Sequence, residues 1–169
     1  MLTKERLKEI LNDHFNYEVL ELVCCKQFHK LRVNPELAQA FVNMNLEHTL
    51  LHSRNLYEFY FRLKIPPRYR DSDYPRANMY VLGFRVPPFT TNITEQFWEK
   101  SSNQILHLGL DRTSNVSEKF NSFQTIGIAN DLLVITKDFV DQLEAESNGF
   151  YMGLEMVELK KNIDAFIQL

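Results

Sequence analysis

The sequence predicts an all-α protein, a helical bundle of about four to five helices with one long loop rich in Pro and Arg. Two observations lead to this prediction. Apolar residues recur at intervals of three and four in long segments of the chain, which is the spacing of one helical face. Helix-capping residues stand where several of these segments begin, and turn-forming residues stand where others end. The 169 residues suit a single helical-bundle domain, which we place over residues 1–169.

Composition and charge limit the classes of function. Hydrophobic residues make up 44% of the chain and charged residues 24%, as in an ordinary globular protein. A net charge of -3 argues against a broadly basic surface, so a contact with RNA would be a local patch. The only cysteines, Cys24 and Cys25, are adjacent and suit neither a disulfide staple nor a zinc site. With no secretory pattern and no apolar run of membrane-spanning length, we expect a cytoplasmic protein without a membrane partner.

Two long helices are predicted in the first part of the chain. The first starts at Thr3, whose side chain can cap it, and runs to about Leu31. The second starts at Pro35 with Asn34 as its cap, because proline at the first helical position loses no hydrogen bond, and runs to about Lys64. Their apolar faces consist of Leu7, Ile10, Leu11, Phe15, Val19, Leu22 and Val23 in the first, and of Leu46, Leu50, Leu56, Tyr57, Tyr60 and Leu63 in the second.

Two histidines lie one turn apart on the second predicted helix. His48 and His52 have the i, i+4 spacing of metal ligands on one helical face. The same polar stripe, set among large apolar groups, also suits the wet edge of a core or of a subunit contact. No Glu follows His48 in an H-E-x-x-H pattern, and the spacing offers no third ligand. We therefore expect no metal and no cofactor.

Prolines interrupt the helical pattern over residues 65–91, which we expect to form an extended loop. Its arginines, mixed with aromatic residues, could bind phosphate and stack bases, or they could be solvated while the aromatics fill gaps over the helices. A short strand is predicted over residues 79–86. The arginines of this loop are Arg68, Arg70, Arg76 and Arg85.

The next predicted helix carries Trp98, the only Trp, and ends near Gly109. Thr91 or Thr94 can cap it, which places Glu95 in its first turn. Further along, Asn103 and His107 are neighbours one turn apart on one face. Beyond the helix, Arg112 could supply a fork for phosphate.

Two more helices complete the prediction. Ser117 can cap a strongly apolar one, in which Gly127 suggests that another helix approaches closely. The segment Ser147-Asn148-Gly149 breaks the chain, and a last amphipathic helix begins near Leu154. The apolar residues of the first of these helices are Phe120, Phe123, Ile126, Ile128, Leu132, Leu133, Ile135 and Phe139.

The register Ser102-Asn103-Gln104-Ile105-Leu106-His107 resembles the motif of the HEPN superfamily of helical-bundle proteins. That motif is an Arg followed by a polar residue, often Asn, with a His five places after the Arg. Asn103 and His107 match it, and Ser102 stands in place of the Arg. Over residues 40 to 145, the chain is also similar to bacterial HEPN-like proteins of uncharacterised function, through His52-Ser53-Arg54-Asn55, Phe59, Trp98 and Arg112.

The resemblance implies a homodimer and, in many members, a metal-independent RNase. In such an enzyme the histidine would move protons at a ribose hydroxyl, and the arginine would stabilise charge on the phosphate. Ser102 cannot do the second of these, so Arg54 or Arg112 would have to replace the missing arginine. The leading hypothesis is therefore a HEPN-like module that binds RNA or a protein partner without catalysis.

Two alternatives remain open. One is an endoribonuclease whose catalytic residues are His107, Asn103 and Arg112, and the other is a purely structural partner protein. Further binding residues in the leading hypothesis are Arg54, Asn55, His52, Arg68 and Arg70. For His107 itself, a histidine hydrogen-bonded to Asn103 or Asp111 is an equally good interpretation.

Overall fold

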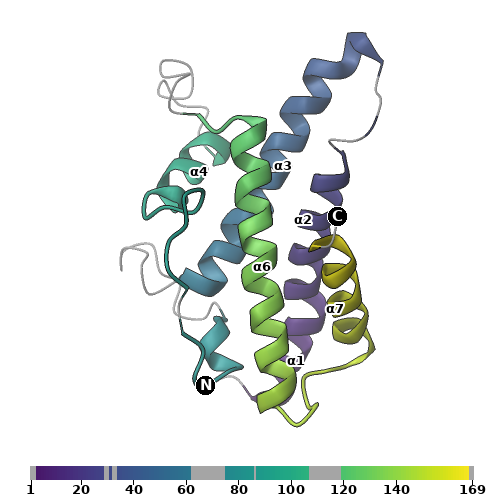
Figure 1. Ribbon diagram of the computed structural model, residues 1–169, viewed down its shortest axis with the longest axis vertical. Coiled ribbons are helices and arrows are strands. Elements are labelled where there is room, and N and C mark those ends of the chain that lie inside the picture. Colours follow the sequence, from purple (N-terminus) through teal and green to yellow (C-terminus); the bar gives the residue numbers. More distant parts are fainter. Residues whose placement is uncertain are drawn as a thin grey trace.

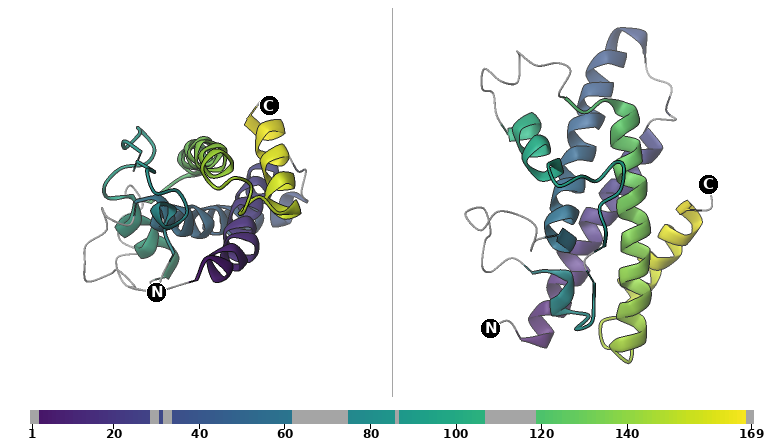
Figure 2. Two further views of the ribbon diagram at one scale, coloured as in Figure 1. Left: turned by 90° about the horizontal axis from the view of Figure 1, so that it is seen from below. Right: turned by 60° about the vertical axis from the view of Figure 1, so that its left-hand side comes forward.

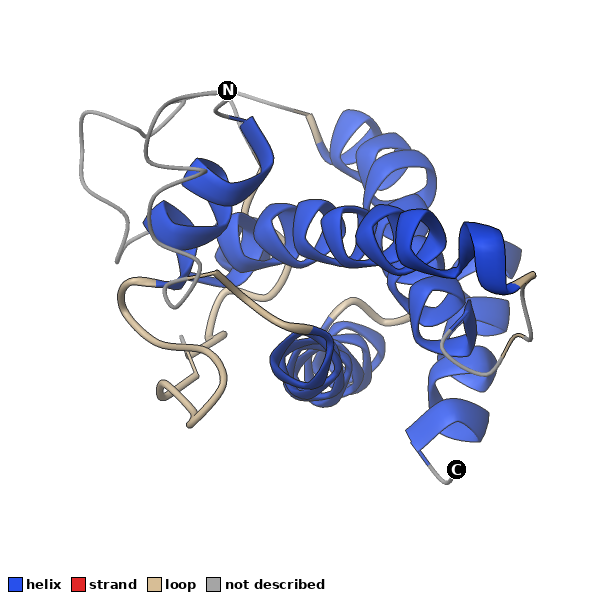
Figure 3. Ribbon diagram, turned by 90° about the horizontal axis from the view of Figure 1, so that it is seen from above, coloured by secondary structure: helices blue, strands red, loops and turns tan. Residues whose placement is uncertain are grey.

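The computed structural model describes residues 3–28, 31, 34–61, 75–85, 87–106 and 119–167. Within this part of the chain the protein is helical and has no strand, which confirms the all-α bundle (Figures 1 and 3). The helices are α1 (Lys4–Ile10), α2 (Asn16–Phe28), α3 (Pro35–Phe61), α4 (Phe97–Leu106), α6 (Ser122–Glu146) and α7 (Leu154–Ile167).

A π-helical segment, Leu11–Phe15, joins α1 to α2 in one continuous rod. Helix α6 runs through the middle of the molecule and packs on α2, α3 and α7 (Figures 1 and 2). Helix α4 lies on the other side of α3 from α2, and the N-terminal part of α3 projects beyond the bundle (Figure 1). Both α2 and α4 therefore pack against α3.

The predicted starts of the first two helices are confirmed. The Thr3 side chain accepts a hydrogen bond from the backbone N–H of Arg6 at 3.2 Å. The Asn34 side chain accepts one from the N–H of Glu36 at 3.1 Å, and α3 begins at Pro35. These side chains satisfy donors that the first helical turn leaves without a partner.

The predicted starts of the next two helices need correction. Neither Thr91 nor Thr94 caps α4, because the Thr90 hydroxyl holds the N–H groups of residues 92 and 93 in a tight turn, and Glu95 precedes the helix. Helix α6 is capped by Asn121 rather than by Ser117, through a capping box with Gln124. Ser117 lies outside the described residues.

The strand predicted over residues 79–86 is wrong for residues 79–85, the part of it that the structure describes. A short 3-10 turn, Ala77–Met79, is followed by further turns, with the N–H of Phe84 donating to the carbonyl of Val81 at 3.0 Å. Val81 and Phe84 are buried while Leu82 is 93% exposed. The apolar residues reach the core through turns of the chain, and a short apolar run does not by itself distinguish such turns from a strand.

The core is centred on Phe139 of α6. Its ring contacts five rings from the π-helical segment, from α3 and from the segment 77–84, all of them edge to face, with centroids 5.2 to 6.3 Å apart. Such arrangements add to the free energy gained by burial alone. The five rings are Phe15, Phe59, Tyr60, Tyr80 and Phe84.

Gly127 has the close neighbour that its place in an apolar helix indicated, but the neighbour is a loop residue and not a helix. A Cβ at this position would lie 2.7 Å from Oδ1 of Asn92. The Asn92 side chain in turn donates to Asp131 at 3.0 Å, and Thr90 donates to the same carboxylate. The loop before α4 therefore approaches α6 closely at Gly127, the glycine of this helix, and is hydrogen-bonded to α6 one turn later at Asp131.

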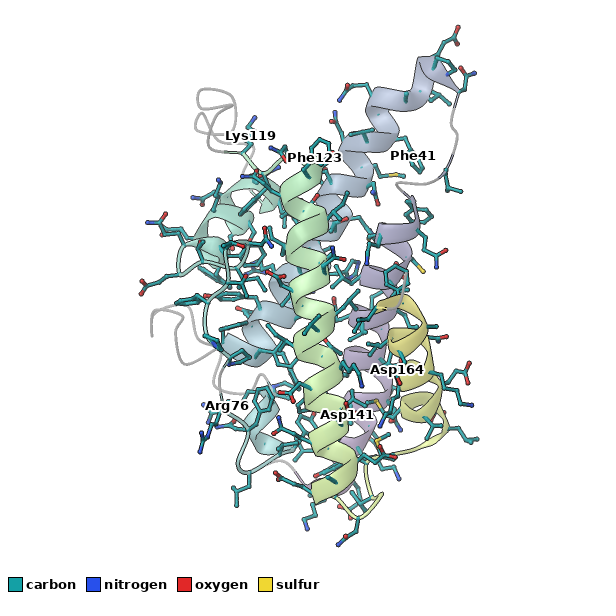
Figure 4. The ribbon with its side chains drawn as sticks, viewed as in Figure 1. Phe41, Arg76, Lys119, Phe123, Asp141 and Asp164 are labelled. Atoms are coloured by element: carbon teal, nitrogen blue, oxygen red, sulfur yellow. The ribbon has the colours of Figure 1, made fainter. Side chains whose placement is uncertain are left out.

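Helix α7 is joined to α6 by a group of ion pairs on the surface. The Lys160 ammonium lies 2.7 Å from Asp141, and Lys137 lies 2.7 Å from Asp141 and 3.1 Å from Asp164; Figure 4 labels both acidic residues. Hydrogen bonds from Lys137 and Lys160 hold the pKa of Asp141 below its ordinary value. Within the described residues, no helix combines the length and the apolar character needed to cross a membrane.

Acid should weaken this junction. Because the pKa of Asp141 is lowered in the folded state, the unfolded chain binds the proton more readily, so the contribution of Asp141 is present above about pH 4 and is lost as the pH falls below it. Asp141 is partly exposed, so we expect Asp141→Asn to lower the free energy of unfolding by about 1 kcal/mol or less at pH 7.

Urea unfolding of both proteins at pH 7 and at pH 3 measures this difference. The control is Asp138→Asn, on the exposed side of the same helix. A gap between wild type and Asp141→Asn that is as large at pH 3 as at pH 7 would contradict the prediction.

Candidate functional site

Arg54 of α3 reaches the residue where the resembled motif has its arginine. Its Nε donates to Oγ of Ser102 at 2.7 Å, and that hydroxyl donates to the carbonyl of Trp98 at 2.7 Å. The guanidinium carbon lies 5.0 Å from the centre of the Trp98 ring. Glu58 completes the group, because it accepts from the Trp98 indole at 3.0 Å and lies 4.0 Å from the guanidinium. A cation from α3 thus stands beside Ser102 of α4.

Helical spacing explains how these side chains meet. Arg54 and Glu58 are four residues apart on α3, and Trp98 and Ser102 are four residues apart on α4, so each pair occupies one face. Ser102 is buried, and its small side chain leaves room for the arginine. The Arg54 and Glu58 side chains are only 18% and 14% exposed, so their charges interact more strongly than in open water.

The other motif residues are placed differently. Asn103, the next residue along α4, is exposed. His107 and Arg112 follow α4 in the sequence and lie outside the described residues, as do Arg68 and Arg70. The pairing of Asn103 with His107 therefore remains a prediction.

His52 and Asn55 point away from Arg54 and toward α2. Side chains two positions apart on an α-helix point in directions that differ by about 200° around the axis, so His52 and Arg54 lie on opposite faces of α3. His52 Nδ1 lies 2.6 Å from Glu18, and the Asn55 amide donates to the same carboxylate at 3.0 Å. The structure therefore divides the binding residues predicted on α3 between two separate faces.

A second pair of contacts extends the group on the α2 side. His48 Nε2 lies 2.9 Å from Glu21 and 3.1 Å from Nε2 of His52. Among the described residues, Glu21, His48 and His52 form the group whose ligand atoms are close enough to hold a metal ion. The spacing of residues in the sequence did not reveal the two glutamates, because Glu21 lies 27 residues before His48. The sequence feature that could have indicated them is the pair of Glu residues three positions apart on one predicted helix.

A third feature lies where α4 meets the start of α6. The Gln104 side chain accepts from the backbone N–H of Phe120 at 2.8 Å, and Lys100 lies over the Phe120 ring at 4.5 Å. One turn further, Phe123 is 88% exposed, although its apolar neighbours indicated burial. Figure 4 shows Lys119 and Phe123 together at this end of α6. We name the group of Lys100, Asn103, Lys119 and Phe123 the α4–α6 surface.

Comparison of the chain with protein-family models, with curated proteins and with solved structures found no match. The case for a function therefore comes from the residues themselves.

The arrangement around Ser102 can be tested through Trp98. Arg54→Ala removes the hydrogen bond to Ser102 and the cation over the indole, so we expect the free energy of unfolding to fall by about 2 kcal/mol. The fluorescence of Trp98, the only Trp, should also change under native conditions. Arg54→Lys keeps the charge without the planar fork and should recover only part of the loss.

Asn103→Ala, on the exposed side of α4, is the matched control and should leave both quantities nearly unchanged. A Trp98 emission spectrum that is identical in wild type and Arg54→Ala would show that the guanidinium does not lie on the indole.

Proposed function

We propose that this protein is a cytoplasmic, HEPN-like module that binds single-stranded RNA without cleaving it. The observation that carries the proposal is Phe123, an aromatic side chain that is 88% exposed and lies four residues after Lys119 at the same end of α6 (Figure 4). An exposed aromatic ring with neighbouring cations is the combination that stacks bases and holds the backbone of single strands, independently of sequence.

The charges near Phe123 favour an anionic ligand. Lys119 lies three residues before Ser122, the first residue of α6, and so lies near the positive end of a 25-residue helix. The Lys100 ammonium lies over the ring of Phe120. This is a local patch on a chain with a net charge of -3. Binding through so few cations would be weak in salt, and stacking would have to supply much of the affinity.

Binding without cleavage agrees with the surroundings of Arg54. Glu58 offsets the positive charge of Arg54, and the Trp98 ring covers one face of its guanidinium. The Nε–H of Arg54 is donated to the hydroxyl of Ser102. An arginine that stabilises developing charge on a phosphate must offer its donors to the ligand. Arg54 instead supports α4, the helix that carries Asn103.

The test is fluorescence anisotropy with labelled single-stranded RNA at two salt concentrations. We expect binding that weakens steeply with salt, and a loss of about 5- to 150-fold in affinity for Phe123→Ala, the range for one base stacked on one ring. Phe123→Tyr should keep most of the affinity. Lys119→Gln should lower the slope of affinity against salt.

The matched control is Phe150→Ala, which removes a 40% exposed ring beyond the opposite end of α6 and should leave RNA binding unchanged. Equal affinities in Phe123→Ala and Phe150→Ala would refute the role of the α4–α6 surface. An absence of RNA binding at low salt would favour the purely structural alternative. Cleavage by wild type that is lost in His107→Ala would establish the endoribonuclease instead.

A homodimer is a second proposal, supported by the projecting part of α3. Leu37, Phe41 and Met44 recur at intervals of four and three on one face of α3, and Leu37 and Met44 are 62% and 58% exposed. Phe41, labelled in Figure 4, packs on Phe28 of α2 at 6.0 Å. An apolar stripe with this spacing suits a parallel or antiparallel contact with the same stripe of a second copy.

Light scattering after size exclusion tests the dimer. We expect a mass of about twice the 20.0 kDa of one chain for wild type, and of one chain for Leu37→Glu combined with Met44→Glu. The control pair, Leu82→Glu and Leu154→Glu, changes two leucines that are even more exposed, outside α3, and should leave the mass unchanged. A wild-type mass of one chain at tens of micromolar protein would contradict the proposal.

A further inference from the structure

The contact between α2 and α3 contains a polar group that the RNA-binding proposal does not use. We name it the Glu–His cluster; it consists of Glu18 and Glu21 from α2 and of His48, His52 and Asn55 from α3. The residues on each helix are three or four apart, so each set occupies one face, and the two faces meet. We propose that this cluster binds one divalent transition-metal ion through Glu21, His48 and His52.

The distances suit such an ion. Oε2 of Glu21 lies 2.9 Å from Nε2 of His48, which lies 3.1 Å from Nε2 of His52, and all three atoms lie within 4.8 Å of one another. Bonds of about 2.0 to 2.1 Å to a tetrahedral ion place neighbouring ligand atoms about 3.3 Å apart. The Glu21–His48 and His48–His52 separations therefore need to grow by only a few tenths of an ångström to admit the ion.

Hydrogen bonding leaves a lone pair in the right place. A carboxylate only accepts hydrogen bonds, so Nδ1 of His52 carries the proton that is donated to Glu18 at 2.6 Å. In neutral His52, Nε2 is then a bare acceptor, and it faces Nε2 of His48 at 3.1 Å. By the same argument Nε2 of His48, which lies 2.9 Å from Glu21, carries a proton that Glu21 and Nε2 of His52 can both accept. A bound cation would take the place of that proton and use the same lone pair of His52.

The residues behind His52 form the second layer expected of a metal site. Metal-binding histidines usually donate their other ring N–H to a carboxylate, which fixes the ring and makes the ligand more basic. Glu18 is that carboxylate, and its other oxygen accepts from the amide of Asn55 at 3.0 Å. The His52 side chain is only 3% exposed, so its orientation is fixed by packing as well.

The ligand set indicates the class of metal. Two imidazoles and one carboxylate suit Zn²⁺, Fe²⁺ and their first-row neighbours, whereas Mg²⁺ and Ca²⁺ prefer oxygen. Cys25 lies one turn after Glu21 but does not belong to the group of residues whose ligand atoms lie together here, so we assign it no bond to the ion. The His48 and Glu21 side chains are 36% and 30% exposed, which gives the ion a path from solvent and leaves a coordination position for water.

A bound ion would join α2 to α3 from the side opposite to Arg54. Because only the folded chain brings the three ligands together, binding stabilises the folded state in proportion to the free metal concentration. Thermal stability is therefore a readout that needs no enzymatic activity, and it does not depend on whether the protein binds RNA.

The experiment uses the full chain after dialysis against EDTA. Calorimetric titration with ZnCl₂ should give one ion per chain at micromolar or tighter affinity, and saturating Zn²⁺ should raise the melting temperature by several degrees. MgCl₂ should do neither. His48→Gln and Glu21→Gln change partly exposed residues, and each should weaken Zn²⁺ binding at least about tenfold. Glu18→Gln should weaken it by about 10- to 100-fold.

The control is His14→Gln, an exposed histidine outside the cluster, which should bind Zn²⁺ as wild type does. Folded wild-type protein that takes up no Zn²⁺ would overturn the proposal, and so would equal affinities in His48→Gln and His14→Gln. Equal stabilisation by Mg²⁺ and Zn²⁺ would also overturn it, because an imidazole site discriminates between them.

Discussion

The packing of aromatic rings around Phe139 is the constraint on which the rest of the structure depends. This one side chain of α6 contacts rings from the π-helical segment, from α3 and from the segment 77–84. Two of those rings, Phe59 and Tyr60, are adjacent on α3, so they fix the rotation of that helix about its axis as well as its depth. Tyr60 adds a buried hydrogen bond to Thr136 at 2.9 Å, which holds the same orientation.

Once that rotation is set, α3 has three different faces. One is the aromatic face in the core. A second presents Arg54 and Glu58 to α4, and the third presents His48 and His52 to α2. Neither polar face touches the other, so the Glu–His cluster and the group around Trp98 are independent sites carried by one helix. RNA binding is proposed at the α4–α6 surface, which shares no residue with the Glu–His cluster, so the RNA-binding and metal-binding proposals can be tested separately.

The sequence predicts what local chemistry decides and misses what depends on partners far away in the chain. The caps Thr3 and Asn34 act within one turn, so residue type and spacing reveal them. The exposure of Phe123 depends on which part of α6 packs against other helices, and the periodicity of apolar residues does not reveal this. For the same reason, the i, i+4 spacing of two histidines on α3 was visible, whereas the glutamates that meet them on α2 were not.

The π-helical segment Leu11–Phe15 has a consequence for how one rod serves two purposes. The buried residues Leu7, Leu11, Phe15 and Val19 recur every four positions, and in a regular α-helix each such step drifts by about 40° around the axis. A wider turn rotates the chain back, so the apolar line stays straight along the bundle. The widened turn therefore determines the direction in which every later side chain of the rod points around the helix axis. These side chains include the two glutamates of the Glu–His cluster.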